Sequence, residues 1–171
     1  AAQIVAPAPG KPEHNYELVQ SLDRLTDWTR RAIAAGVVAF DTETTSLDPL
    51  RAELVGFSLA LSPGEACYVP LGHRPAGGGL LDEKPPQIPL ADAIAAIKPM
   101  LEDPSVLKIG HNIKYDALVM QGHAIAIGPI DDTMLISFAL DAGSHGHGMD
   151  ELSELHLEHK TITYDEVTGT G

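Results

Sequence analysis

Two carboxylates one residue apart follow an apolar run near the start of the chain. Asp41, Thr42 and Glu43 come directly after residues 37–40, which read Val-Val-Ala-Phe and predict a buried strand. Because side chains alternate between the faces of a strand, we expect Asp41 and Glu43 to point the same way and Thr42 the other. Two such carboxylates repel each other unless a cation lies between them, and hard oxygen ligands suit Mg²⁺ or Mn²⁺. An ordinary acidic strand end has the same pattern.

A second polar group lies in residues 106–116, which read Val-Leu-Lys-Ile-Gly-His-Asn-Ile-Lys-Tyr-Asp. A short apolar strand runs into Gly110, and a helical pattern begins near Asn112. Asn112 and Asp116 are four residues apart, so they are predicted to share one helix face. Asp116 would then meet Asp41 if the two strands are neighbours. A capped amphipathic helix with a surface aspartate is the alternative interpretation.

The elements that position these residues follow from apolar periodicity and turn residues. A chain of 171 residues buries about 70% of its unfolded surface, enough for one compact domain. Ser21 is a predicted N-cap and Gly36 a predicted C-terminal stop of the first helix. Three successive strands with tight turns predict an antiparallel meander, and the later alternation of helices and strands predicts an α/β mixed sheet. The predicted strands are 16–19, 37–40, 53–61, 67–71, 106–109 and 125–127, and the later helices are 90–101, 131–141 and 149–158.

Composition narrows the class of protein. Lys and Arg number 11 against 24 Asp and Glu, a formal net charge of −13. Unaided duplex binding is therefore unexpected, because it rests on clusters of basic side chains. Residues 1–15 are rich in Ala and Pro and predict an interdomain linker, which leaves 16–171 as the folded domain. The single cysteine, Cys67, is predicted to be a buried thiol, and a reducing cytoplasm fits.

Together the two polar groups are similar to a known family. Asp-Thr-Glu-Thr-Thr-Ser-Leu-Asp at 41–48 and Gly-His-Asn-Ile-Lys-Tyr-Asp at 110–116 resemble motifs I and II of the DEDD 3′–5′ exonucleases. The resemblance is closest to the proofreading domains of bacterial DNA polymerase I, and segments 132–135, 149–152 and 159–164 fit as well. It implies a ribonuclease-H-like mixed sheet flanked by helices, a polymerase domain in the same full-length chain that supplies a basic groove, and a bacterial cytoplasmic setting at the nucleoid.

The resemblance also implies a reaction and roles for residues. Two Mg²⁺ or Mn²⁺ ions at Asp41, Glu43 and Asp116 would hydrolyse the 3′-terminal nucleotide of single-stranded or frayed DNA, which is proofreading. Contacts to the DNA strand are implied for Thr42, Leu47, Asn112, Tyr115 and Tyr164.

The chain departs from the family pattern in motif III, which supplies a fourth carboxylate with a Tyr or His. No Tyr-x-x-x-Asp follows Asp116, so we expect motif III to lie beyond Gly171 and this chain to have reduced or no activity. His145 and Asp150 have the spacing of the His-type motif, but the surrounding glycines disfavour a helix there, and Asp150 is instead a predicted helix N-cap.

Two further interpretations stay open. The chain could be a catalytically inert exonuclease-like module that has a structural or DNA-binding role. It could also be a DEDD-type ribonuclease, because sugar discrimination depends on a 2′-hydroxyl contact that no motif reveals. The acidic pair Asp131–Asp132 is predicted to be the favourable N-terminal charge of a helix.

Overall fold

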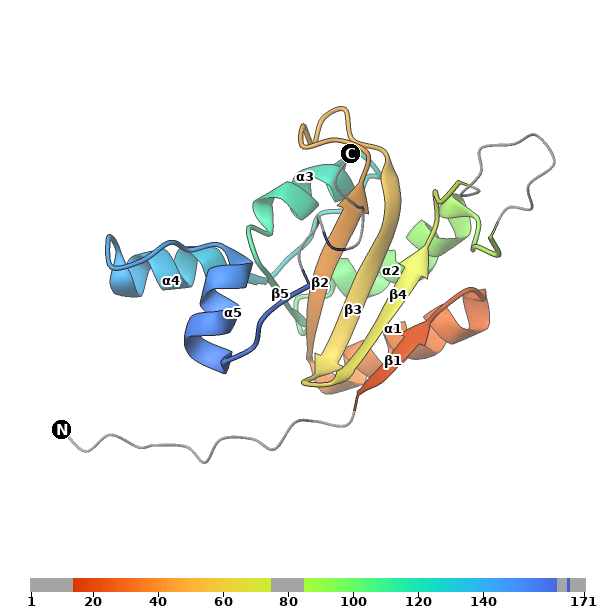
Figure 1. Ribbon diagram of the computed structural model, residues 1–171. Helices are drawn as coiled ribbons and strands as arrows, with labels where there is room; N and C mark the ends of the chain where they lie inside the picture. The colour runs from red at the N-terminus through yellow and green to blue at the C-terminus, as the bar shows by residue number, and fades with distance from the viewer. Residues whose placement is uncertain (1–13, 75–84, 163–165, 167–171) are drawn as a thin grey trace.

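A computed structural model describes residues 14–74, 85–162 and 166, and it contains one six-stranded sheet with five helices (Figure 1). The strands lie in the order β1-β4-β3-β2-β5-β6. The α/β class and the mixed sheet flanked by helices are therefore confirmed. The elements are β1 Asn15–Leu18, α1 Leu22–Ala35, β2 Val37–Thr44, β3 Leu54–Ser62, β4 Glu65–Pro70, α2 Leu90–Glu102, β5 Leu107–Gly110, α3 Lys114–Gln121, β6 Ile130–Asp132, α4 Thr133–Asp141 and α5 Met149–Leu157.

The sheet topology brings the two polar groups to one edge. Strands β2, β3 and β4 form the predicted antiparallel meander, whereas β5 pairs in parallel with β2 and β6 in parallel with β5. The register sets Val37 beside Leu107 and Ala39 beside Ile109. Because parallel strands end at the same edge, the carboxyl end of β2 and the chain leaving β5 lie side by side.

One face of the sheet carries the hydrophobic core. Helices α1 and α2 pack against this face, behind the strands in Figure 1. Alternate residues of the central strands point into it, as the period of two requires. The sheet contributes Val38, Phe40, Phe57, Leu59 and Val69, and the helices contribute Leu25, Trp28, Ala32, Ala93, Ile97, Met100 and Leu101, all buried.

The opposite face of the sheet has small side chains. The register aligns Ala39 with Ala60, and Ala60 with Ala66. Asp41 and Ser58 form the next row on the same face. Helix α4, in contrast, buries none of its residues, although its sequence is strongly apolar. The apolar surface of this side of the molecule is therefore only partly covered.

Helix α1 begins and ends as its sequence predicts. The Ser21 hydroxyl accepts a hydrogen bond from the Arg24 amide at 3.4 Å, and Gly36 ends the helix in the left-handed conformation at φ 71°. A residue with a Cβ is strained at that φ, which explains the glycine. Trp28 is buried, and its indole N–H donates to Glu17 at 3.0 Å.

Two local predictions are wrong. Residues 125–127 form no strand, and the edge strand is β6 five residues later. Ile125 is buried in irregular backbone, so its apolar character reflects packing rather than strand pairing. The N-cap of α5 is Gly148 instead of Asp150, which lies in the first turn and accepts a hydrogen bond from the Thr161 hydroxyl at 2.7 Å.

One buried side chain agrees with the sequence prediction. Cys67 is buried, as predicted. Among the described residues, none of the helices has the length and apolar character needed to cross a membrane.

Candidate active site

Asp41 and Glu43 lie on β2, on the face that is turned away from the core. Thr42 between them is buried, Asp41 is half-buried and Glu43 is exposed, which is the alternation expected of a strand. The pairing with β3 shifts register between Glu43 and Thr44. Such a bulge bends the strand and redirects the side chains beside it, and bulges of this kind are common next to active sites.

Asp116 comes from the first turn of α3 and reaches the same strand. Its Oδ1 atom accepts two hydrogen bonds from Thr42, one from the backbone amide at 2.8 Å and one from the hydroxyl at 2.6 Å. Asp116 is only 3% exposed. The two bonds fix the Asp116 carboxylate against β2. Asp116 therefore lies in the same site as Asp41, although the two residues are 75 positions apart in the sequence.

The negative charges of Asp116 and Glu43 act on the Asp41 carboxylate. Burial, followed by the charges of Asp116 and Glu43, raises the pKa of Asp41 to about 6. Burial also raises the pKa of Asp116, against the lowering effect of its bonds from Thr42. A raised pKa means that the charged form lacks a counter-charge. The site therefore favours a cation.

A cavity of about 700 Å³ opens over these carboxylates. Tyr115 forms part of its wall, and its hydroxyl is 2.5 Å from the Thr44 hydroxyl and also donates to the Ser46 carbonyl. Leu47 is 97% exposed, on the loop that follows β2. Every predicted site residue except Tyr164, which lies outside the described residues, lines this cavity: Asp41, Thr42, Glu43, Leu47, Asn112, Tyr115 and Asp116.

The donor set of the cavity fits a hard divalent cation. Its wall holds carboxylate, hydroxyl and amide oxygens and no lysine or arginine. In the geometry of the described residues, however, no three His, Cys, Asp or Glu side chains come close enough together to hold a metal ion. Mg²⁺ commonly takes one or two protein carboxylates and completes its shell with water and substrate phosphate. The oxygen atoms of the cavity wall therefore suit part of the shell of such an ion.

The position predicted for Asn112 is wrong. Asn112 precedes α3 with a φ of 61°, so it does not share a helix face with Asp116. Its amide donates to Asp132 Oδ1 at 3.0 Å, and the same oxygen caps α4 by accepting from Met134 at 2.9 Å. Asparagine tolerates the left-handed conformation better than most residues. The predicted role of Asp132 at the start of a helix is confirmed, and the link to Asn112 is additional.

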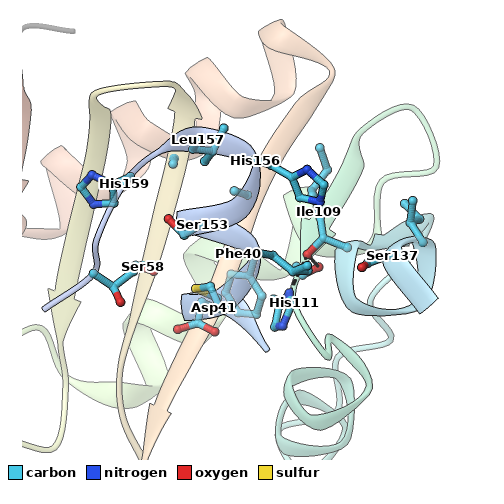
Figure 2. Close-up of a pocket in the computed structure, with 18 of the residues that line it drawn as sticks. Phe40, Asp41, Ser58, Ile109, His111, Ser137, Ser153, His156, Leu157 and His159 are labelled. Carbon is cyan, nitrogen blue, oxygen red and sulfur yellow. Dashed lines mark hydrogen bonds between the residues drawn. The ribbon is translucent and has the colours of Figure 1, made fainter. Parts of the chain in front are cut away.

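His111 is a site residue that the sequence analysis missed. It lines both the cavity over the carboxylates and a second cavity, whose lining is drawn in Figure 2. Its Nδ1 is 2.9 Å from the Thr133 hydroxyl, whereas Nε2 is buried with no partner among the described residues. The sequence position of His111, between Gly110 at the end of β5 and Asn112 in the site, could have indicated that it lies in the site.

The second cavity is an apolar groove of about 710 Å³ that ends at Asp41. Its floor is the small-residue face of the sheet, and α4 and α5 form its walls. Figure 2 shows Asp41 and His111 near one another, with Ser153, His156 and Leu157 of α5 above the strands. His145 and Asp150 line neither cavity. They are not placed to act with Asp41, which argues against the His-type motif at those positions.

The raised pKa of Asp41 predicts a pH-dependent loss of stability in the metal-free protein. Between 3.8, the ordinary pKa, and about 6, the folded state holds a proton that the unfolded state releases. The stability from that proton is complete below pH 3.8 and is lost as pH rises through about 6. In EDTA, thermal unfolding should show Asp41→Asn gaining stability relative to wild type from pH 4 to pH 7, and Mg²⁺ should narrow the difference at pH 7. An unchanged difference across this range would contradict the shift.

Comparisons with known proteins agree with the geometry. A family model described as 3′-5′ exonuclease, of the DNA polymerase A type, matches residues 16–171. DNA polymerase I of Rhizobium leguminosarum is 48% identical over 170 residues, covering 91% of this chain and 16% of that protein. The chain therefore spans about a sixth of the length of this relative.

Two solved structures have a similar fold. RNase D of Escherichia coli, described as an exoribonuclease involved in structured RNA processing, has a TM-score of 0.63 at 20% identity, over 90% of this chain and 36% of that one. NrnC of Brucella melitensis with bound Mg²⁺ has a TM-score of 0.58 at 22% identity, over 93% of this chain and 68% of that one. These similarities establish the ribonuclease-H-like exonuclease fold.

Proposed function

The chain belongs to the 3′-5′ exonuclease family of DNA polymerase I, and we propose that it removes 3′-terminal nucleotides from single-stranded or frayed DNA, as a proofreading domain in replication and repair. The observation that carries this proposal is the convergence of Asp41, Glu43 and Asp116 on one cavity, from a strand and a helix that are far apart in the sequence. Such a set of carboxylates suits metal-assisted hydrolysis of a phosphodiester.

Asp41, Glu43 and Asp116 are the residues that would hold the divalent ions, and Mg²⁺ or Mn²⁺ in a pair is the expected complement. When bound, such ions supply Lewis-acid stabilisation of the charge that develops on the phosphate. Thr42 holds Asp116 in position through its amide and hydroxyl. The oxygen-rich wall of the cavity supports the proposed binding of these ions.

The remaining wall residues are proposed to bind the strand. Leu47 projects into solvent at the cavity and could press against the terminal base. Tyr115, with its hydroxyl anchored at Thr44 and Ser46, presents a fixed ring edge on the other side. Asn112 is held by Asp132 through its backbone amide, and its side-chain oxygen accepts a hydrogen bond from Lys114. If Leu47 and Tyr115 hold one terminal base between them, the site accepts a single strand, so a frayed 3′ end enters more readily than a paired one.

The acidic charge of the chain supports a protein in which another domain binds the DNA duplex. With a formal net charge of −13, the domain repels a phosphate backbone over most of its surface. We propose that a polymerase domain in the same full-length protein holds the duplex, since the Rhizobium relative is a DNA polymerase I about six times longer than the matched region. Under this proposal the protein works in the bacterial cytoplasm at the nucleoid. Ribonuclease activity is not favoured, because the similarity to RNase D extends to the fold alone.

The test is nucleotide release from an oligonucleotide labelled at its 3′ end, using a product of the same gene that continues beyond Gly171. We expect release of nucleoside 5′-monophosphates from the 3′ end of single-stranded DNA with Mg²⁺, none in EDTA, and little from a fully paired end or from RNA of the same sequence. Equal release from RNA would point to the ribonuclease interpretation. No release from any substrate would leave the inert binding module.

A further inference from the structure

Tyr68, His73 and Gln87 form a connected polar unit beside the proposed active site. The Tyr68 hydroxyl is 2.6 Å from His73 Nε2, and the two rings meet edge to face at 5.6 Å between centroids. Gln87 holds the backbone of His73 from both sides: its Oε1 accepts from the His73 amide at 2.8 Å, and its Nε2 donates to the His73 carbonyl at 3.0 Å. Three residues from two segments thus fix the position of one phenol oxygen.

The phenol oxygen lies over Gly56, in the row of the sheet that contains Glu43. Register pairs Gly56 on β3 with Glu43 on β2. A Cβ atom at Gly56 would lie 2.2 Å from the Tyr68 hydroxyl oxygen and 2.8 Å from the Val69 carbonyl oxygen. The glycine is therefore required for the Tyr68 ring to lie across β3, and its absence of a side chain opens the space between the phenol and Glu43.

Glu43 is within reach of that phenol. Directly opposed residues on antiparallel strands have Cβ atoms roughly 4.5–5.5 Å apart, and a glutamate side chain can span most of that distance. A phenol keeps its proton at neutral pH and can therefore donate it in a hydrogen bond to a carboxylate. The Glu43 carboxylate has no hydrogen-bond partner among the described residues, unlike Asp116, which is fixed by Thr42.

We propose that Tyr68 is a positioning residue for Glu43, donating its phenol proton to the Glu43 carboxylate when the site binds substrate. His73 Nε2–H then donates to the phenol oxygen, and Gln87 keeps His73 in place. A carboxylate only accepts hydrogen bonds, so the phenol proton is the one that can join the two groups. The role of Glu43 as an ion ligand comes from the proposed function, on which this inference rests.

Tyr68→Phe tests the inference, because it removes the hydroxyl and keeps the ring. Outer-shell partners of metal ligands typically contribute 10–100-fold to metal affinity or activity. We therefore expect kcat to fall by about tenfold or more and the KM for the oligonucleotide to stay unchanged, in the form of the protein used for the nucleotide-release test. The Mn²⁺ affinity, measured by electron paramagnetic resonance of free Mn²⁺ without substrate turnover, should fall in the same direction.

Matched variants separate positioning from folding. Tyr16→Phe removes a phenol that is 67% exposed on β1 and should change neither kcat nor Mn²⁺ affinity. His73→Ala should reproduce the Tyr68→Phe defect in kcat, and an unchanged circular dichroism spectrum would show that the sheet is retained. If Tyr68→Phe matches wild type in both kcat and Mn²⁺ affinity, the inference is overturned. If wild type itself releases no nucleotide, the proposed function fails, and the Mn²⁺ affinities alone decide for or against Tyr68.

Discussion

Asp41→Asn is expected to abolish nucleotide release while the domain stays folded. Asparagine has the shape of aspartate but no charge, so the core residues Phe40 and Thr42 on either side keep their packing. Removing one member of a concerted catalytic set lowers the rate by on the order of 10⁴-fold or more. The effect should fall on kcat, measured by single-turnover release from a labelled single-stranded oligonucleotide with saturating Mg²⁺.

A matched control makes this result specific. Asp23→Asn changes an exposed aspartate in the first turn of α1, on the far side of the molecule's core, and should leave the release rate at the wild-type value. Metal-free Asp41→Asn should also unfold at a higher temperature than wild type at pH 7, because the raised pKa of Asp41 reports an unfavourable charge in the folded state. A variant that lost both activity and folded structure would not bear on catalysis, and one that kept full activity would exclude Asp41 from the site.

Strand β2 is the part of the molecule that could be predicted best from sequence. Alternation along β2 depends only on the period of a strand, so the common face of Asp41 and Glu43 followed directly from their spacing. The same local rules predicted Ser21 and Gly36 at the ends of α1. These features are determined by contacts between residues that are close in the sequence, so tertiary packing changes them little.

The chain that enters α3 was predicted less well, because tertiary contacts decide it. Helical periodicity placed Asn112 on α3, but its amide bonds to Asp132, which comes from the next strand and is invisible to a local pattern. The orientation of His111 likewise depends on a distant residue, because its Nδ1 contacts the Thr133 hydroxyl while its Nε2 stays buried without a partner among the described residues. The Tyr68 unit was missed for the same reason, since its position follows from the register of three strands.

The second large effect is expected for the longer protein that we propose from the length of the Rhizobium relative, in which further chain follows Gly171. The groove beside Asp41 is apolar, and four large exposed apolar side chains of α4 and α5 line it: Ile136, Leu140, Met149 and Leu157. The same two helices also expose Leu135, Phe138 and Leu155. Large exposed apolar patches mark sites of contact. A sheet face lined by alanine and serine allows the close approach of another element, which could bring a further carboxylate to Asp41. We propose that a downstream segment packs here.

A product extended downstream of Gly171 should therefore release 3′ nucleotides faster than the 171-residue chain, by on the order of 10²-fold or more, as expected when a member of a catalytic set is restored. It should also unfold at a higher temperature. Single-turnover release and thermal unfolding measure the two effects on the same samples. Full activity in the 171-residue chain would contradict this prediction. It would indicate that residues already present beside Asp41, such as His111, complete the site.

Ala60→Glu distinguishes docking in the groove from any other benefit of the longer chain. Ala60 lies on the groove floor, so a glutamate there should obstruct an apolar segment. Docking of that segment would also bury the glutamate charge without a partner, which is unfavourable. We expect the substitution to remove most of the rate and stability gained by extension and to alter the 171-residue chain little, because the groove is open there. Ala35→Glu, at the exposed end of α1, should leave the gain intact. Equal behaviour of the two variants would show that the downstream segment acts without occupying the groove.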